Sequence, residues 1–325
     1  MSVFRYKFAF QFYPVMTIDR DNKMVVYLIA VFSIILWGMS YIWSDRLLKI
    51  GIPVEYFVSV RVQIAGLLLL LYNIIVGNNI HMKRKDSFKF LALAFCEPFI
   101  YFVCETYGIR LTESPTYSAL IIATTPIFSV TAGVLFFKEK LTLGNIFGML
   151  ICLAGLVLVT ISASSIGEYF ILGVILLMVA VFAEVGHASC TKSLSGDYKP
   201  EVIVMYQFLI GSAYLMPLFL TKGMKHFEYE LYMSWQVLEP ILCLAVLCSS
   251  VAFSLWVSAI KNLGVAKSSI FLAMIPVVTA LVGYTLGTET LSYWQWCGIA
   301  VACVGLVLTQ LTCRKCRCRS GVNQS

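Results

Sequence analysis

The chain repeats itself over residues 118–160, SALIIATTPIFSVTAGVLFFKEKLTLGNIFGMLICLAGLVLVT, which align without a gap on residues 268–310, SSIFLAMIPVVTALVGYTLGTETLSYWQWCGIAVACVGLVLTQ. Eleven of the 43 aligned positions are identical. The identities include Pro126 with Pro276 and several glycines, which a shared hydrophobic composition does not favour. We therefore interpret the two stretches as copies of one structural unit.

The composition is that of a membrane protein. Of the 325 residues, 60% are hydrophobic and 13% are charged, whereas soluble domains have about 25% charged residues. A soluble fold of this size could not bury so much apolar surface. We predict an all-α, multi-pass protein of the cell (plasma or inner) membrane. The net charge of +7 forms no basic face outside the short loops and tails, so no nucleic-acid partner is expected.

We predict ten transmembrane helices, since each span needs about 20 mainly apolar residues. Their approximate ranges are 24–43, 54–77, 87–109, 114–137, 143–162, 168–190, 201–221, 235–260, 265–287 and 291–312. With the N-terminus in the cytoplasm, 18 lysines and arginines fall in cytoplasmic segments and 5 in outer loops. This asymmetry favours cytoplasmic N- and C-termini.

The repeat extends to two five-helix units, 24–162 and 168–312. Because five is odd, the second unit must enter the membrane from the opposite side, and inverted repeats of this kind are typical of secondary transporters. The segment 1–23 lies on the membrane surface, or else the true start is Met16 or Met24. The tail 313–325 is basic and rich in cysteine, and is interpreted as a cytoplasmic anchor, a palmitoylation site or a weak metal motif.

The paired prolines, Pro126 and Pro276, lie about 12 and 11 residues into their helices, near the bilayer midplane. Proline removes a backbone donor and frees the carbonyl four residues back. Corresponding helix interruptions in two halves indicate a central binding site. The alternative is a kink that serves packing only.

The same residues resemble a known family. Thr124 to Leu141, Gly148 and the run Ala154-Gly155-Leu156-Val157-Leu158 resemble the EamA-type module of the drug/metabolite transporter superfamily, and 276–305 resembles its second copy. Leu36-Trp37-Gly38 and Arg61 resemble the opening half of the module. The resemblance implies a central cavity lined mainly by helices one, three, four, six, eight and nine, and transport of small solutes, often export. Helix one lacks the membrane glutamate of the related small multidrug exporters, so their proton-coupling scheme is not carried over.

Ionisable side chains inside a membrane are costly and mark function by default. Glu97, followed by Pro98, lies about 15 Å into the third span. It either binds and releases a proton during transport, or it is the partner of a hydroxyl or of Arg61. Glu105 is expected in an exposed vestibule nearer the outer surface.

Three further residues are candidates for binding substrate or coupling ions. Arg61 lies about 10 Å into its span, and it either snorkels outward or attracts an anionic substrate group in the cavity. Glu184 and His187 are three residues apart and share a helix face, so they form a proton relay or lie hydrated near the cytoplasm. An aromatic set could line the cavity, although packing is favoured for most of its members: Trp37, Tyr41, Tyr101, Tyr107, Trp256 and Phe271.

We predict a secondary active transporter that moves metabolites, amino acids or drug-like solutes by alternating access, with export the expected direction. No paired His/Asp metal motif, nucleophile elbow or nucleotide-binding loop is present, so we expect no enzyme, metal or cofactor. The alternatives are a receptor or channel, and a membrane enzyme without transport activity. The expected partners are a small solute, the lipid bilayer and coupled protons, in a monomer or a homodimer.

Overall fold

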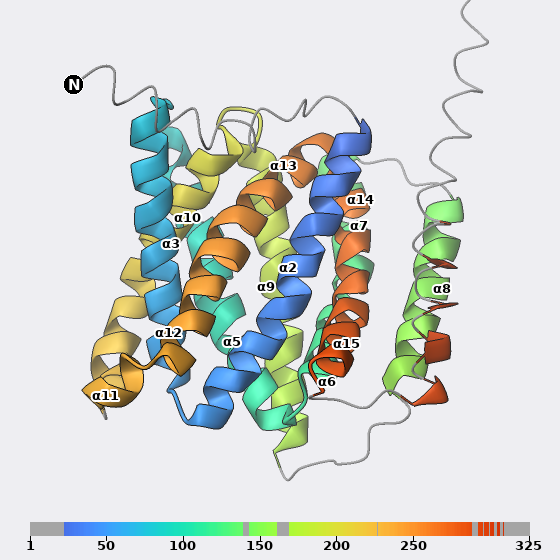
Figure 1. The fold of residues 1–325 in the computed structure, drawn as a ribbon. Helices are drawn as coiled ribbons and strands as arrows, with labels where there is room; N and C mark the ends of the chain where they lie inside the picture. Colours follow the sequence, from blue (N-terminus) through green and yellow to red (C-terminus); the bar gives the residue numbers. More distant parts are fainter. Residues whose placement is uncertain are drawn as a thin grey trace, which may run out of the picture.

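The computed structural model describes residues 23–138, 143–160, 169–225 and 227–287, and parts of 292–308. Within these residues the protein is a bundle of helices without strands (Figure 1). Eight helical segments of this part are long and apolar enough to cross a membrane. They are α2 (Lys23–Ile50), α3 (Val54–Val76), η1 (Arg84–Asp86) with α4 (Ser87–Ala94), η2 (Phe95–Ile100) and α5 (Tyr101–Thr112), α6 (Pro115–Ile122) with α7 (Thr125–Phe137), α9 (Phe170–Leu194), α10 (Pro200–Leu218) with η3 (Phe219–Gly223), α12 (Trp235–Leu242) with η4 (Cys243–Ala252) and α13 (Phe253–Leu263), and α14 (Val265–Ser269) with η5 (Ile270–Met274) and α15 (Ile275–Thr285).

These eight segments correspond to predicted spans one to four and six to nine. The fifth predicted span coincides with α8 (Leu143–Thr160), and the tenth lies partly outside the described residues. The tail 313–325 and nearly all of the segment 1–23 also lie outside them. A short helix, α11 (Tyr229–Tyr232), lies in the loop before α12.

The third span is interrupted where Glu97 lies. The backbone of Glu97 is extended (φ −147°, ψ 122°) within η2, which links α4 to α5 and contains a cis peptide bond between Glu97 and Pro98. Proline has no N–H to donate to the helix, which favours an interruption here. The Pro98 ring packs against Gly211 of α10, where an added Cβ would lie 2.3 Å from the ring. The interruption therefore depends on a close helix contact.

The paired prolines also coincide with helix interruptions. Pro126 lies in the first turn of α7, just after α6 ends at Ile122. Pro276 lies in the first turn of α15, just after the 3₁₀ segment η5. Proline is tolerated in the first turn because that N–H has no partner within the helix. The Ile122 carbonyl, four residues before Pro126, instead accepts a hydrogen bond from the Thr125 hydroxyl.

The two halves run in opposite directions and exchange contacts. In Figure 1, α2 begins at the upper end of the bundle and its counterpart α9 begins at the lower end, and α3 and α10 are opposed in the same way. The helices α3 and α10 pack along each other, α2 packs on η4, α13 and α15, and α9 packs on α5, α6 and α7. Each opening helix of a half therefore packs on the third and fourth helices of the other half.

Candidate functional site

A small cavity lies between the two halves. Its lining comes from predicted helices one, three, four, six, eight and nine, which the family resemblance implied, and also from helix two. The lining residues are Trp37, Ser40, Tyr41, Arg61, Glu97, Tyr101, Phe102, Glu105, Ile122, Glu184, Phe253, Leu272 and Ile275. Because both halves contribute walls, a relative movement of the halves would change the shape of this cavity.

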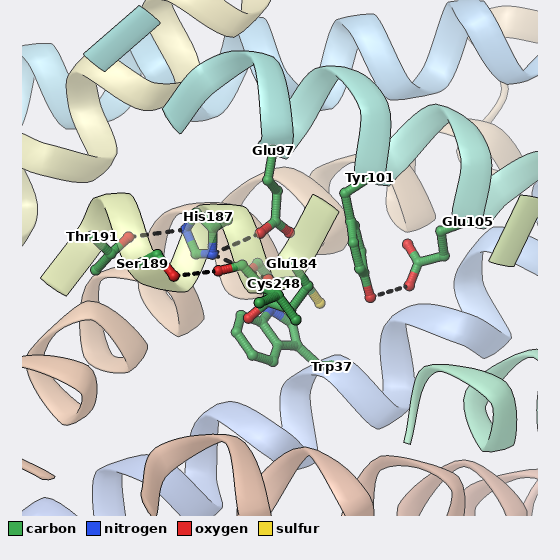
Figure 2. Close-up of polar contacts among 10 residues, drawn as sticks. Trp37, Glu97, Tyr101, Glu105, Glu184, His187, Ser189, Thr191 and Cys248 are labelled. Atoms are coloured by element: carbon green, nitrogen blue, oxygen red, sulfur yellow. Dashed lines mark hydrogen bonds and ion pairs between the residues drawn. The ribbon is translucent and has the colours of Figure 1, made fainter. Parts of the chain in front are cut away.

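Two carboxylates and a histidine meet beside the cavity (Figure 2). The Nδ1 atom of His187 lies 3.0 Å from Oε2 of Glu97 and 3.1 Å from Oε2 of Glu184. All three side chains are buried, with exposed fractions of 0%, 2% and 5% for His187, Glu97 and Glu184. On the other side of the ring, Nε2 of His187 lies 3.3 Å from the Thr191 hydroxyl. The interpretation of Glu184 and His187 as merely hydrated groups near the cytoplasm is therefore wrong.

Glu97 has an unsatisfied oxygen in this cluster. Its Oε2 atom is buried and has no hydrogen-bond partner among the described residues, although it lies 3.0 Å from Nδ1 of His187. In the described part of the chain, no lysine or arginine nitrogen lies within 4.0 Å of this carboxylate. An ion pair between Glu97 and Arg61, one of the alternatives drawn from the sequence, is thus not formed.

Arg61 lies inside the protein and does not snorkel outward. Its side chain is 3% exposed, and the guanidinium carbon lies 3.7 Å from the centre of the Phe102 ring. Its Nε has no hydrogen-bond partner, and the guanidinium forms no ion pair within 4.0 Å among the described residues. A cation over an aromatic face is stabilised by the ring quadrupole. Arg61 therefore presents a charge to the cavity without a carboxylate to neutralise it directly.

Glu105 also lines the cavity, which corrects the prediction of an exposed vestibule position. It is buried and accepts a hydrogen bond of 2.9 Å from the Tyr101 hydroxyl. That prediction treated the third span as one unbroken α-helix, whereas the backbone is not helical at Glu97. The relative directions of the Glu97 and Glu105 side chains therefore differ from those of a regular helix.

Trp37 lines the cavity and also packs against the aromatic rings of helix eight. Its indole N–H donates a 3.1 Å hydrogen bond to the carbonyl of Cys248 in η4. Its ring meets Phe253 and Trp256 edge-on, at centroid distances of 4.9 and 5.2 Å. A π-helical segment such as η4 displaces carbonyls from the regular ladder, so they can accept bonds from side chains. This wall thus joins helix one to helix eight of the other half.

The structure divides the remaining candidates. Of the aromatic set, Trp37, Tyr41 and Tyr101 line the cavity, and the other three do not. Neither Pro126 nor Pro276 lines it, but Ile122 and Ile275, next to the two helix interruptions, do. Sequence reasoning missed Ser40, Phe102 and Phe253 as cavity residues, because serine and phenylalanine are ordinary in membrane helices and carry no distinguishing signal.

The comparisons with known proteins agree on one kind of protein. The model of the EamA-like transporter family matches residues 24–161 and 171–311. An uncharacterized transporter, YetK of Bacillus subtilis (strain 168), is 23% identical over 89% of this chain and 87% of its own length. An uncharacterized transporter of Archaeoglobus fulgidus is 25% identical over 88% of this chain and 98% of its own length.

A relative that matches over a shorter stretch is named for an activity. It is a probable terminal-alkyne amino-acid exporter of Streptantibioticus cattleyicolor, 26% identical over 59% of this chain and 62% of its own length. One solved crystal structure superposes with a TM-score of 0.75 at 15% identity, covering 90% of this chain and 99% of that one. At this identity the superposition shows a shared fold alone.

Proposed function

Because the chain belongs to the EamA-like transporter family, we propose that this multi-pass membrane protein is a secondary active transporter that works by alternating access. The observation that carries the proposal is the charged cavity to which both halves contribute. Substrate sites of secondary transporters lie at the interface of such repeats. We further propose that the two matched ranges are the two predicted five-helix units, with both termini in the cytoplasm, which reporter fusions at each end would test.

The chemistry of the cavity favours a small solute with polar and apolar parts. Arg61 supplies a positive charge for an anionic group, and Glu105 supplies a negative charge for a cationic one. The rings of Trp37 and Phe102 offer apolar walls. Amino acids, small metabolites and drug-like solutes fit this description, and the relative that is named an amino-acid exporter supports export as the direction. Proton coupling through Glu97 stays a prediction.

Counterflow of radiolabelled solutes into proteoliposomes would test the proposal, and a cavity-filling variant would show where the solute passes. Ser40 is buried in the cavity wall, so Ser40→Phe should abolish any counterflow that the wild type shows. Ser193→Phe is the matched control, because Ser193 is exposed near the end of α9. Counterflow by this variant should stay at the wild-type level. The proposal fails if no solute of a broad panel exchanges, and the cavity assignment fails if both variants transport equally.

A further inference from the structure

Glu97, Glu184 and His187 form a cluster in which each side chain offers one atom that can bind a metal ion. Glu184 and His187 form a Glu-x-x-His pair on one face of α9, and Glu97 faces them from η2 (Figure 2). Their donor atoms all lie within 4.8 Å of one another. In helical bundles, Glu-x-x-His pairs that project inward with further glutamates hold transition metals.

The cluster places two carboxyl groups against one imidazole nitrogen. Nδ1 of His187 carries at most one hydrogen, yet two carboxylate oxygens converge on it. Among the described residues, neither carboxylate has a lysine or arginine nitrogen within 4.0 Å, and Oε2 of Glu97 has no hydrogen bond. Buried carboxylates that stay ionised without compensation cost roughly several kcal/mol each. A proton or a bound cation removes this cost, and a cation satisfies both carboxylates and the imidazole at once.

The spacing fits the coordination sphere of a small divalent ion. Two ligands with bonds of about 2.1 Å at right angles are about 3.0 Å apart, and at the tetrahedral angle about 3.4 Å apart. The distances from Nδ1 to the two carboxylate oxygens are 3.0 and 3.1 Å. Two of the three distances between ligand atoms are therefore those expected for adjacent ligands of one ion, and all three lie within 4.8 Å.

The surroundings of His187 complete the arrangement. A histidine that binds a metal usually donates its other ring N–H to a neighbouring oxygen, which fixes the tautomer. The Thr191 hydroxyl lies 3.3 Å from Nε2 and can accept this bond, which leaves Nδ1 free for the metal. Glu97 and Glu184 also line the cavity, so the site borders the space that a small solute or an ion would occupy.

We propose that Glu97, Glu184 and His187 form a binding site for a first-row divalent transition metal ion, with Mn²⁺ as the representative. The imidazole nitrogen disfavours Mg²⁺ and Ca²⁺, which prefer oxygen ligands alone. The sequence led us to expect no metal, because one of the three ligands comes from a helix far away in the chain. The proposal concerns binding and does not require that the protein transports anything.

Mn²⁺ binding to the full chain, purified in detergent, tests the site. Free Mn²⁺ is counted by electron paramagnetic resonance, and Mn²⁺ is chosen because the cysteines of the tail prefer softer ions. The wild type should bind one Mn²⁺ per chain, and Glu97→Gln should weaken this binding by about tenfold or more. Glu55→Gln is the matched control, since Glu55 is a buried carboxylate that belongs neither to the cavity lining nor to the cluster, and it should bind as the wild type does.

Two further measurements keep the result clear if Glu97→Gln fails to fold. Thr191→Val keeps the side-chain shape and removes only the outer hydrogen bond, so it should weaken Mn²⁺ binding by about tenfold. Co²⁺ added to the wild type should give the ligand-field absorption of a nitrogen- and oxygen-ligated ion. The proposal is overturned if the wild type takes up no Mn²⁺, or if Glu97→Gln and Glu55→Gln bind it equally. Counterflow is a separate measurement, so its failure would count against transport and not against this site.

Discussion

Single hydrogen bonds hold the two halves together around the cavity. The indole of Trp37 donates to the Cys248 carbonyl, and the Cys248 thiol lies 3.2 Å from the Leu36 carbonyl. The Thr279 hydroxyl reaches the Gly38 carbonyl on the other side of the same helix, at 3.1 Å. Each bond crosses from helix one to the opposite half, so these residues determine how far α2 can move relative to its neighbours.

Replacing Trp37 by phenylalanine should destabilise the protein. The carbonyl of Cys248, which is a buried residue, would lose its donor, at a cost of about 1 kcal/mol. Trp235→Phe is the control, because Trp235 is 71% exposed on the surface of the bundle. Thermal unfolding in detergent should show a lower midpoint for Trp37→Phe than for Trp235→Phe. Equal midpoints would mean that this hydrogen bond contributes nothing.

At the scale of helices, the bundle depends on contacts that admit no side chain. Gly108 of α5 lies against Leu177 of α9, and a Cβ built on Gly108 would be 2.5 Å from Cγ of Leu177. Small residues at membrane helix interfaces let the backbones approach closely. The α5–α9 contact positions Glu97, which precedes α5, against His187 on α9.

Gly108→Ala should push α5 away from α9 and cost about 1–3 kcal/mol. Leu177→Ala removes the clashing atoms. The loss of unfolding free energy in the double variant, Gly108→Ala with Leu177→Ala, should therefore be smaller than the sum of the losses in the two single variants. Gly196→Ala is the control, because a Cβ there meets nothing within 4 Å. Thermal unfolding of the four variants measures the coupling. Additive effects would contradict the close contact between α5 and α9.

At the scale of the whole molecule, a polar network ties the halves together at one end. Lys83 forms a 2.8 Å ion pair with Asp197, and the Tyr198 hydroxyl accepts the Lys83 N–H and donates to Asp86. Lys199 donates to Asn78 at 2.7 Å. The network joins the loop after α3 to the loop before α10. If the protein alternates as proposed, these two loops must move apart when the cavity opens at this end of the bundle.

Asp197→Asn should loosen that end at neutral pH. Its hydrogen bond with Lys83 lowers the pKa of Asp197, so the ion pair is complete at neutral pH and is lost as the pH falls through that lowered value. Deuterium uptake in residues 77–86 should therefore rise in Asp197→Asn, and the difference from the wild type should shrink as the pH falls below about 4. Asp45→Asn, which breaks only the Asp45–Lys49 pair within α2, should leave uptake in 77–86 unchanged. An increase that persists at low pH would contradict the role of the charge.

The amino-acid sequence by itself determined the membrane class, the positions of eight spans, the internal repeat and the two proline interruptions. These follow from composition and from periodicity along one helix, which are local properties. It also singled out Glu97, Glu184 and His187, since any ionisable group in an apolar span stands out. Only the tertiary structure decided that the three meet, that Glu105 faces the cavity and that Arg61 forms no ion pair with a carboxylate of the described residues. Contacts between helices depend on the break at Glu97 and on packing between distant segments, and no pattern within a single helix reports on either.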